Sequence, residues 1–220
     1  MDMTESLERR ALLYGLLARL HTYPVDEQLL DAMAALRLEE PLPGLGEALG
    51  QMREAAAAFR TPTGIEALNV EATRLFEGPG GPAAPPYASF YLHGRLMGPA
   101  ALSAHQFYLA HRALPDADVM VPPDQLALEL GFMAHLAARS EQAAAAGSPG
   151  ESWESLRASR EFLEGHLLIW IPRFAEDVVR AADSAFFVGL ARFTLAALEW
   201  DGRWLEALEA EQLEMEGVRR

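Results

Sequence analysis

The 220-residue chain has no cysteine, few basic residues and no long apolar run. Without cysteine it can form no disulfide, thiolate metal site, iron–sulfur cluster or cysteine nucleophile. Half of its residues are hydrophobic, but they are scattered at helical spacing, and no apolar run approaches the ~18 residues that cross a bilayer. We therefore expect a soluble protein without stable membrane insertion.

The first residues, MDMTESLERR, carry acids before any apolar stretch and have no small-residue cleavage site. A secretory signal has the opposite pattern, with a basic start, an apolar centre and a cleavage site. The sequence therefore favours a cytoplasmic protein.

Basic residues number 18 against 32 acidic ones, which gives a formal net charge of −14. Nucleic acid is disfavoured as a partner because phosphate affinity comes from cations that this chain lacks. A basic ligand is the natural complement, and a field of this sign would speed its capture. Acidic soluble proteins are common, however, and net charge by itself says more about solubility than about partners.

Motifs of catalysis are missing as well. The chain contains no GxxxxGK phosphate loop, no GxSxG nucleophile elbow and no HExxH zinc pair. Its histidines do not pair at helical i, i+4 spacing; they are His21, His93, His105, His111, His135 and His166. We therefore predict no catalytic residue, metal site or cofactor, and a small hydrolase or nucleotide-binding enzyme is disfavoured.

Helical periodicity runs along the whole chain. Leu13, Leu16, Leu17 and Leu20 fall at i, i+3, i+4 and i+7, which predicts an amphipathic first helix. Further helices are expected over residues 26–37, 45–60, 63–77, 100–113, 124–146, 148–172 and 187–197, followed by a glutamate-rich end. No alternation long enough for a strand occurs. The sequence predicts an all-α, single-domain globular bundle of about ten helices over residues 1–220, with proline-rich connecting loops.

The stretch EATRLFEGPGGPAAPPYASFY, residues 71–91, is the most unusual part of the chain. Its glycines and prolines forbid a continuous helix. Apolar and aromatic side chains nevertheless flank the break on both sides: Leu75, Phe76, Tyr87, Phe90 and Tyr91. Rigid turns combined with large rings indicate a shaped groove rather than a solvent linker.

A second punctuated stretch is VPPDQLALELGFM, residues 121–133. Pro122 and Pro123 suit a helix start, and Asp124 in the first turn would complement the helix dipole. The loop over residues 114–123 divides the chain near its middle and is a possible hinge. We expect this stretch and residues 71–91 to come together in space.

Glu129 shares a predicted helical stripe with Gln125, Phe132 and Leu136. This spacing would set a carboxylate at the margin of an apolar surface, where it could meet an arginine of a ligand. An acid at the edge of the core explains the pattern equally well. For the flanking aromatic residues, plain core packing is the interpretation that the sequence alone favours.

In the order RLF, GPG, PPYxSxY, PPDxxxxEL and FLEGHLLIWIPRF, the segments between about residues 65 and 195 resemble the TorD/DmsD branch of the redox-enzyme maturation chaperones. The resemblance implies an all-helical cytoplasmic chaperone. Such a protein binds the twin-arginine leader of the apo-form of a molybdopterin-containing enzyme, assists cofactor insertion and proofreads the precursor before export. The client enzyme is not identifiable from the sequence.

The resemblance also implies which positions bind the leader. With Glu129 and Phe132, they give the candidate peptide-binding set: Leu75, Phe76, Pro86, Tyr87, Ser89, Tyr91, Pro123, Asp124, Gln125, Glu129 and Phe132. One departure is Gln125, where most members of the family have histidine. Glutamine keeps hydrogen bonding but has no titratable charge, so a pH-tuned role at this position is in doubt.

Two alternatives stay open. The chain would instead be a helical assembly adaptor if it bound the mature region of a redox enzyme without recognising a leader. The resemblance also implies a tendency to exchange helices between protomers, so a monomer and a domain-swapped homodimer are both possible.

Overall fold

The computed structural model describes residues 3–36, 45–78, 80–116 and 120–218. Within these ranges every named element is a helix, which confirms the predicted all-α bundle. Its elements are α1 (Met3–Leu20), α2 (Glu27–Ala35), α3 (Leu45–Ala58), α4 (Pro62–Phe76), α5 (Ala88–His93), α6 (Pro99–Ala110), α7 (Leu126–Ala145), α8 (Pro149–Phe162), η1 (Leu163–Leu167), α9 (Ile171–Ala181) and α10 (Ala185–Val218).

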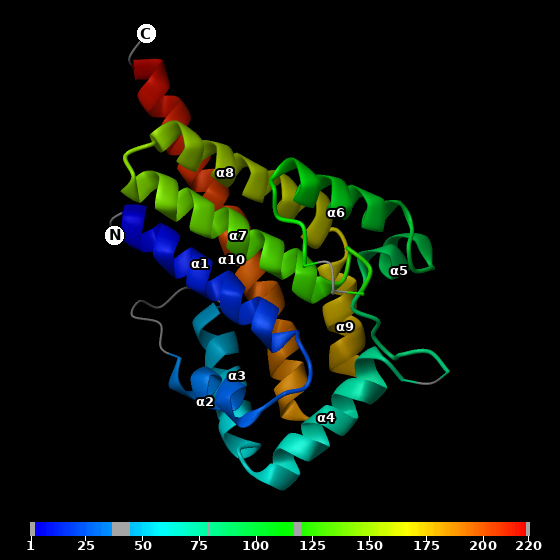
Figure 1. The fold of residues 1–220 in the computed structure, drawn as a ribbon. Coiled ribbons are helices and arrows are strands. Elements are labelled where there is room, and N and C mark those ends of the chain that lie inside the picture. Colours follow the sequence, from blue (N-terminus) through cyan, green and yellow to red (C-terminus); the bar gives the residue numbers. More distant parts are fainter. Residues whose placement is uncertain (1–2, 37–44, 79, 117–119, 219–220) are drawn as a thin grey trace.

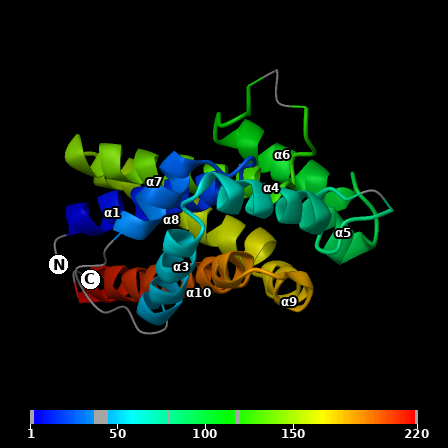
Figure 2. The same ribbon diagram turned by 90° about the horizontal axis from the view of Figure 1, so that it is seen from below.

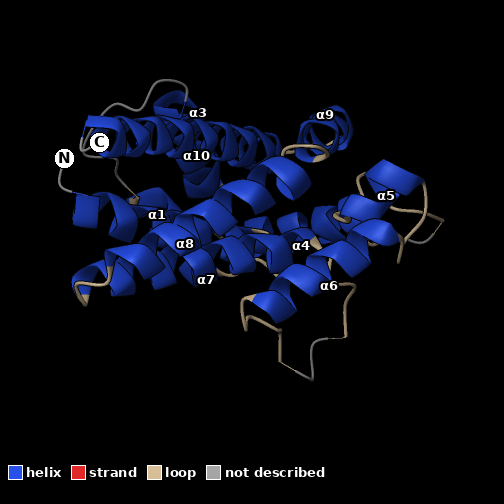
Figure 3. Ribbon diagram, turned by 90° about the horizontal axis from the view of Figure 1, so that it is seen from above, coloured by secondary structure: helices blue, strands red, loops and turns tan. Residues whose placement is uncertain are grey.

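Helix α7 lies between α1 and α8, while α10 packs against α3 and α9 on the other side of the molecule (Figures 1 and 2). The short helices α5 and α6 contact each other at one edge of the bundle (Figure 3). None of the helices in the described ranges is long and apolar enough to cross a membrane.

The apolar face predicted for the first helix packs into the core. Leu17 and Leu20 are fully buried, and Leu13 and Leu16 pack against the core from its margin. Burying each such side chain contributes about 1.5–3 kcal/mol relative to exposure, so faces of this kind hold the bundle together.

The helix predicted over residues 148–172 is not continuous. Helix α8 instead ends at Phe162, continues as one turn of π-helix in η1, and is interrupted before Pro172. Pro172 lies in the first turn of α9, where a missing N–H breaks no hydrogen bond. The proline therefore begins a helix rather than ending one.

A buried ion pair joins α1 to α10. The Arg10 guanidinium donates from Nε to Asp201 Oδ1 at 2.7 Å and from Nη2 to Asp201 Oδ2 at 3.0 Å. The Tyr14 hydroxyl donates to Asp201 Oδ2 at 2.7 Å. All three side chains are buried, so solvent does not screen the charge of Arg10. Among the described residues, the Asp201 carboxylate is the counter-charge of this guanidinium.

Gly189 brings α10 close to α3. A Cβ added to Gly189 would lie 3.3 Å from the Cα and 3.4 Å from the Sδ of Met52. Both contacts are tighter than ordinary van der Waals packing, and one of them is with backbone, which cannot rotate away. The two helices therefore depend on glycine at this position.

We expect Gly189→Val to lower the free energy of unfolding by about 1–3 kcal/mol, the usual cost of overpacking a core. Urea unfolding at 25 °C measures the change. Gly15→Val in α1 is the matched control, because a Cβ there meets nothing within 4 Å. Equal stabilities of the two variants would contradict the close packing of α3 and α10.

Candidate peptide-binding site

The two proline-rich stretches lie side by side, as expected. Tyr87 and Gln125 form an isolated antiparallel bridge. Next to it, the Leu126 N–H donates to the Pro86 carbonyl at 2.9 Å and the Ala88 N–H donates to the Asp124 carbonyl at 3.1 Å. We call residues 84–89 and 122–126 together the junction.

Asp124 caps a different helix from the one predicted. Its Oδ2 accepts the Ser89 N–H at 2.6 Å, which places the carboxylate at the start of α5 rather than in the first turn of α7. Helix α7 begins later, at Leu126, with Gln125 as its N-cap; Gln125 Oε1 accepts the Leu128 N–H at 3.2 Å. The reason is the bridge to Tyr87, which holds Gln125 in an extended conformation.

Glu129 lies in the interior, so the prediction of a carboxylate at a surface margin is wrong. The side chain has no exposed area, and its Oε2 accepts the Trp170 Nε1–H at 3.1 Å. Its neighbours on the stripe, Phe132 and Leu136, are buried too, so the stripe is a core face. The helical pattern gave no sign of this burial, because the hydrogen-bond partner of the carboxyl is the indole N–H of Trp170 on another part of the chain.

Burial raises the pKa of the Glu129 carboxyl well above its ordinary value. The hydrogen bond from Trp170 lowers this pKa, and the nearby Asp124 carboxylate raises it. Glu129 Oε1 and Asp124 Oδ1 are both buried and meet no hydrogen-bond partner among the described residues. The two buried acids therefore lie close enough for the charge of Asp124 to raise the pKa of Glu129.

Most of the other predicted residues form the core under the junction, as the core-packing interpretation had it. Phe76 stacks on Tyr23 at a centroid distance of 5.0 Å, and Tyr91 stacks on Trp170 at 5.4 Å. Phe132 meets Phe162 edge-on at 4.7 Å. The buried members of the set are Leu75, Phe76, Pro86, Ser89, Tyr91, Asp124, Glu129 and Phe132.

Tyr87, Pro123 and Gln125 are the predicted residues that remain partly accessible. Burial raises the pKa of the Tyr87 hydroxyl, and the carboxylates of Glu77 and Asp124 raise it further. Glu77 is exposed, so it places a negative charge in solvent near Tyr87. The sequence analysis missed Glu77, although an acid directly before the glycine and proline run was a visible signal.

An exposed apolar surface adjoins the junction on α5, α6 and the turn between them. We call it the α5–α6 surface and define it by the exposed side chains Phe90, Leu92, Leu96, Met97, Leu102 and Leu109. The sequence analysis named Phe90 as flanking a groove and missed the others, because helical spacing alone does not say which apolar residues reach solvent.

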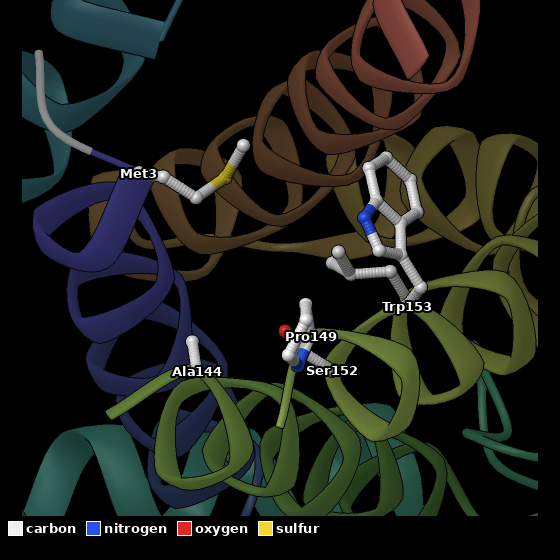
Figure 4. Close-up of a pocket in the computed structure, with 6 residues that line it drawn as sticks. Met3, Ala144, Pro149, Ser152 and Trp153 are labelled. Carbon is white, nitrogen blue, oxygen red and sulfur yellow. The ribbon is translucent and has the colours of Figure 1, made fainter. Parts of the chain in front are cut away.

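A separate apolar pocket of about 160 Å³ lies at the other end of α7. Figure 4 shows side chains from α1, α7 and α8 around it, and its lining residues are Met3, Ala144, Pro149, Ser152, Trp153 and Leu156. Since Leu126 and Ala144 are 18 residues apart on α7, this pocket lies about 27 Å from the junction. It contains none of the predicted residues.

Comparison with known proteins places this architecture in a family. The family model described as the nitrate reductase delta subunit matches residues 38–176, and the chain belongs to that family. Among curated relatives, the chaperone protein TorD of Vibrio cholerae is 28% identical over 215 residues, which cover 91% of this chain and 94% of the relative. The TorD chaperone of Vibrio atlanticus is 26% identical over 207 residues, covering 90% and 95%.

Among solved structures, a redox enzyme maturation protein from Archaeoglobus fulgidus matches with a TM-score of 0.49 and 23% identity, covering 94% of this chain and 95% of that one. The family match and the TorD relatives confirm the resemblance to TorD-type maturation chaperones that the sequence motifs indicated.

Proposed function

We propose that this chain is a cytoplasmic maturation chaperone that binds the twin-arginine leader of a molybdoenzyme precursor, assists cofactor insertion and proofreads the precursor before export. Membership of the family and the TorD relatives support a maturation chaperone. The observation that carries leader binding is the junction itself, where the two motif-bearing stretches pair through Tyr87 and Gln125.

The accessible part of the junction suits a basic peptide. Tyr87 and Gln125 offer a ring face, a hydroxyl and an amide, while Glu77 supplies a carboxylate that an arginine of the leader would pair with. The overall charge of −14 would attract the same cations at longer range. Because Gln125 does not titrate, recognition at this position would be insensitive to pH.

The buried members of the predicted set have a supporting role in this proposal. Asp124 fixes the start of α5 through Ser89, and Glu129 fixes Trp170, against which Tyr91 stacks. They hold the accessible residues in place and do not meet the arginines directly. No catalytic residue and no cofactor of the chaperone itself is part of the proposal.

The oligomeric state belongs to the proposal as an open choice between a monomer and a domain-swapped dimer. The hinge predicted over residues 114–123 includes residues 117–119, which lie outside the described ranges, and it stays a prediction.

A synthetic twin-arginine leader peptide from a molybdoenzyme of the same organism is expected to bind with a dissociation constant around 1 μM, about −8 kcal/mol. Replacing its two arginines by glutamines should weaken binding by about tenfold to a hundredfold, since a single charge-assisted hydrogen bond to Glu77 contributes about 1.5–3 kcal/mol. Isothermal titration calorimetry measures both values. Equal binding of the two peptides would refute recognition of the arginine pair.

Two controls sharpen this test. Glu77→Gln should weaken the binding of the arginine leader and leave the binding of the glutamine leader unchanged. Only the arginine leader carries a cation that pairs with the Glu77 carboxylate. A pull-down with the leaderless client tests the alternative: a helical adaptor for the mature enzyme would capture the leaderless form as well as the complete precursor.

A further inference from the structure

We propose that the α5–α6 surface binds the apolar stretch of the leader as a helix laid along α6, next to the arginine pair at the junction. The inference rests on the proposed function and assigns residues to a part of the ligand that the junction does not accommodate. The observations behind it are the composition of this edge, its geometry and its charge.

The segment of the chain that forms α5 and α6 is almost without charge. From Gly78 to His111 the only Asp, Glu, Lys or Arg is Arg95, in a chain of which 23% is charged. A solvated face of an ordinary acidic protein would carry several charges over such a length. Several exposed apolar side chains on two helices that contact each other are typical of an interaction site.

Helix α6 exposes two leucines on its outer side, with the uncharged polar residues His105 and Gln106 exposed between them. Its inner face buries Ala101, Ala104 and Tyr108, whereas Leu102 and Leu109 on its outer side are 61% and 59% exposed. These two leucines are seven residues apart, so they lie on one side of the helix about 10.5 Å from each other. That separation is two helical turns, the repeat at which a bound apolar helix presents its own side chains.

The turn before α6 adds to the same surface. Met97 adopts a φ of 57°, in the left-handed region that non-glycine residues seldom occupy, and its side chain is exposed. Backbone held in such a conformation is concentrated at ligand sites. The next residue, Gly98, lets α6 approach α5 closely, because a Cβ there would lie 2.9 Å from the His93 ring.

Two hydrogen bonds fix α6 before any ligand arrives. The Tyr108 hydroxyl donates to the Pro123 carbonyl at 2.7 Å, which ties α6 to the junction. Ser103 Oγ lies 3.1 Å from Nε2 of the buried His166, which ties it to η1. Because the surface is already ordered, it loses little conformational entropy on binding, and this loss reduces the affinity little.

Charge decides between a leader and a second copy of the chain as the occupant. Two copies meeting at this surface would bring together molecules of net charge −14 each, which repel. A twin-arginine leader carries cations beside an apolar stretch, so the field attracts it and the uncharged surface accepts its apolar part. The leader is therefore the occupant that fits both features.

The test is leader binding by the full-length variant Leu102→Glu/Leu109→Glu, followed by calorimetry with the same synthetic leader. We expect its dissociation constant to rise about tenfold to a hundredfold, as the loss of two apolar contacts predicts. The matched control is Leu12→Glu/Leu213→Glu, which places the same two charges at leucines that are 67% and 63% exposed on α1 and α10. Circular dichroism melting verifies that both variants fold.

The outcomes separate the two proposals. If the wild-type chain binds no leader, the proposed function fails. If the wild-type chain binds and both double variants bind equally well, the function stands and the α5–α6 surface is the wrong site.

Sedimentation velocity tests the second-copy occupant: a wild-type dimer that Leu102→Glu/Leu109→Glu converts to a monomer would overturn the inference. A leader with serines in its apolar stretch should bind the wild type weakly. It should bind Leu102→Glu/Leu109→Glu with the same weak affinity, because the apolar contacts are already lost.

Discussion

Asp201→Ala is expected to lower the free energy of unfolding by about 3–5 kcal/mol, a large fraction of the 5–15 kcal/mol that holds a typical domain together. The substitution removes the carboxylate that accepts two hydrogen bonds from Arg10 and one from Tyr14. The guanidinium would then be a buried cation without a counter-charge. Denaturant unfolding followed by circular dichroism measures the loss.

Two comparisons show whether the buried charge is the cause. Glu5→Ala removes the acid of an exposed ion pair with Arg9 on the same helix, and should cost at most about 1 kcal/mol. Replacing the whole cluster, with Arg10→Met, Tyr14→Phe and Asp201→Leu together, should restore most of the lost stability, because no polar group is left unpaired. A loss below 1 kcal/mol for Asp201→Ala would contradict this account.

Glu129→Gln is expected to make the protein more stable than the wild type at neutral pH, by an amount that grows as the pH rises. Burial raises the pKa of Glu129 well above that of the unfolded carboxyl, which is near 4.3. Below pH of about 4.3 both states hold the proton and the acid costs nothing. Above it the unfolded chain gives up the proton while the folded chain keeps it, so wild-type stability falls by up to about 1.4 kcal/mol per pH unit until the folded pKa is passed.

Glutamine does not titrate and still offers an oxygen to the Trp170 N–H, so Glu129→Gln escapes this cost. Urea unfolding of both proteins between pH 4 and pH 8 measures the difference. As a control, Glu161→Gln makes the same substitution on the exposed side of α8. Stability curves of wild type and Glu129→Gln that run parallel across this range would show that Glu129 is not held in its neutral form.

The fold was predictable from the sequence because its information is local. Leucines at i, i+3, i+4 and i+7 identify the buried face of α1, and Phe187, Leu190, Thr194 and Ala197, at i, i+3, i+7 and i+10, identify that of α10. Each pattern is read within one helix and needs no knowledge of what it packs against.

The candidate site was only partly predictable because its decisive contacts join residues far apart in the chain. Asp124 looked like a residue of the α7 start, and its actual partner is the Ser89 N–H, 35 positions earlier. Glu129 suited the edge of a stripe or the core equally well until Trp170, 41 positions later, supplied the donor. Arg10 and Asp201 are 191 positions apart, and nothing in the local pattern links them.

Motifs nevertheless predicted which stretches of the chain lie together. The order of the two proline-rich stretches indicated that they belong together, and the pairing of Tyr87 with Gln125 agrees with this expectation. What the motifs did not contain was the accessibility of each side chain. Eight of the eleven candidate residues are buried, and the exposed groups beside them, Glu77 and the leucines of α6, belong to no motif.

Helix α5 has six residues, fewer than two turns, and a helix of that length does not persist in water without outside support. Its first two amides, those of Ala88 and Ser89, both donate to Asp124. Helix α5, which carries Phe90 and Leu92, is therefore stabilised by Asp124, a residue outside the helix. A substitution in the PPD triplet, residues 122–124, would therefore change the shape of the whole α5–α6 surface, and its effect would report the integrity of that surface rather than the loss of one side-chain contact.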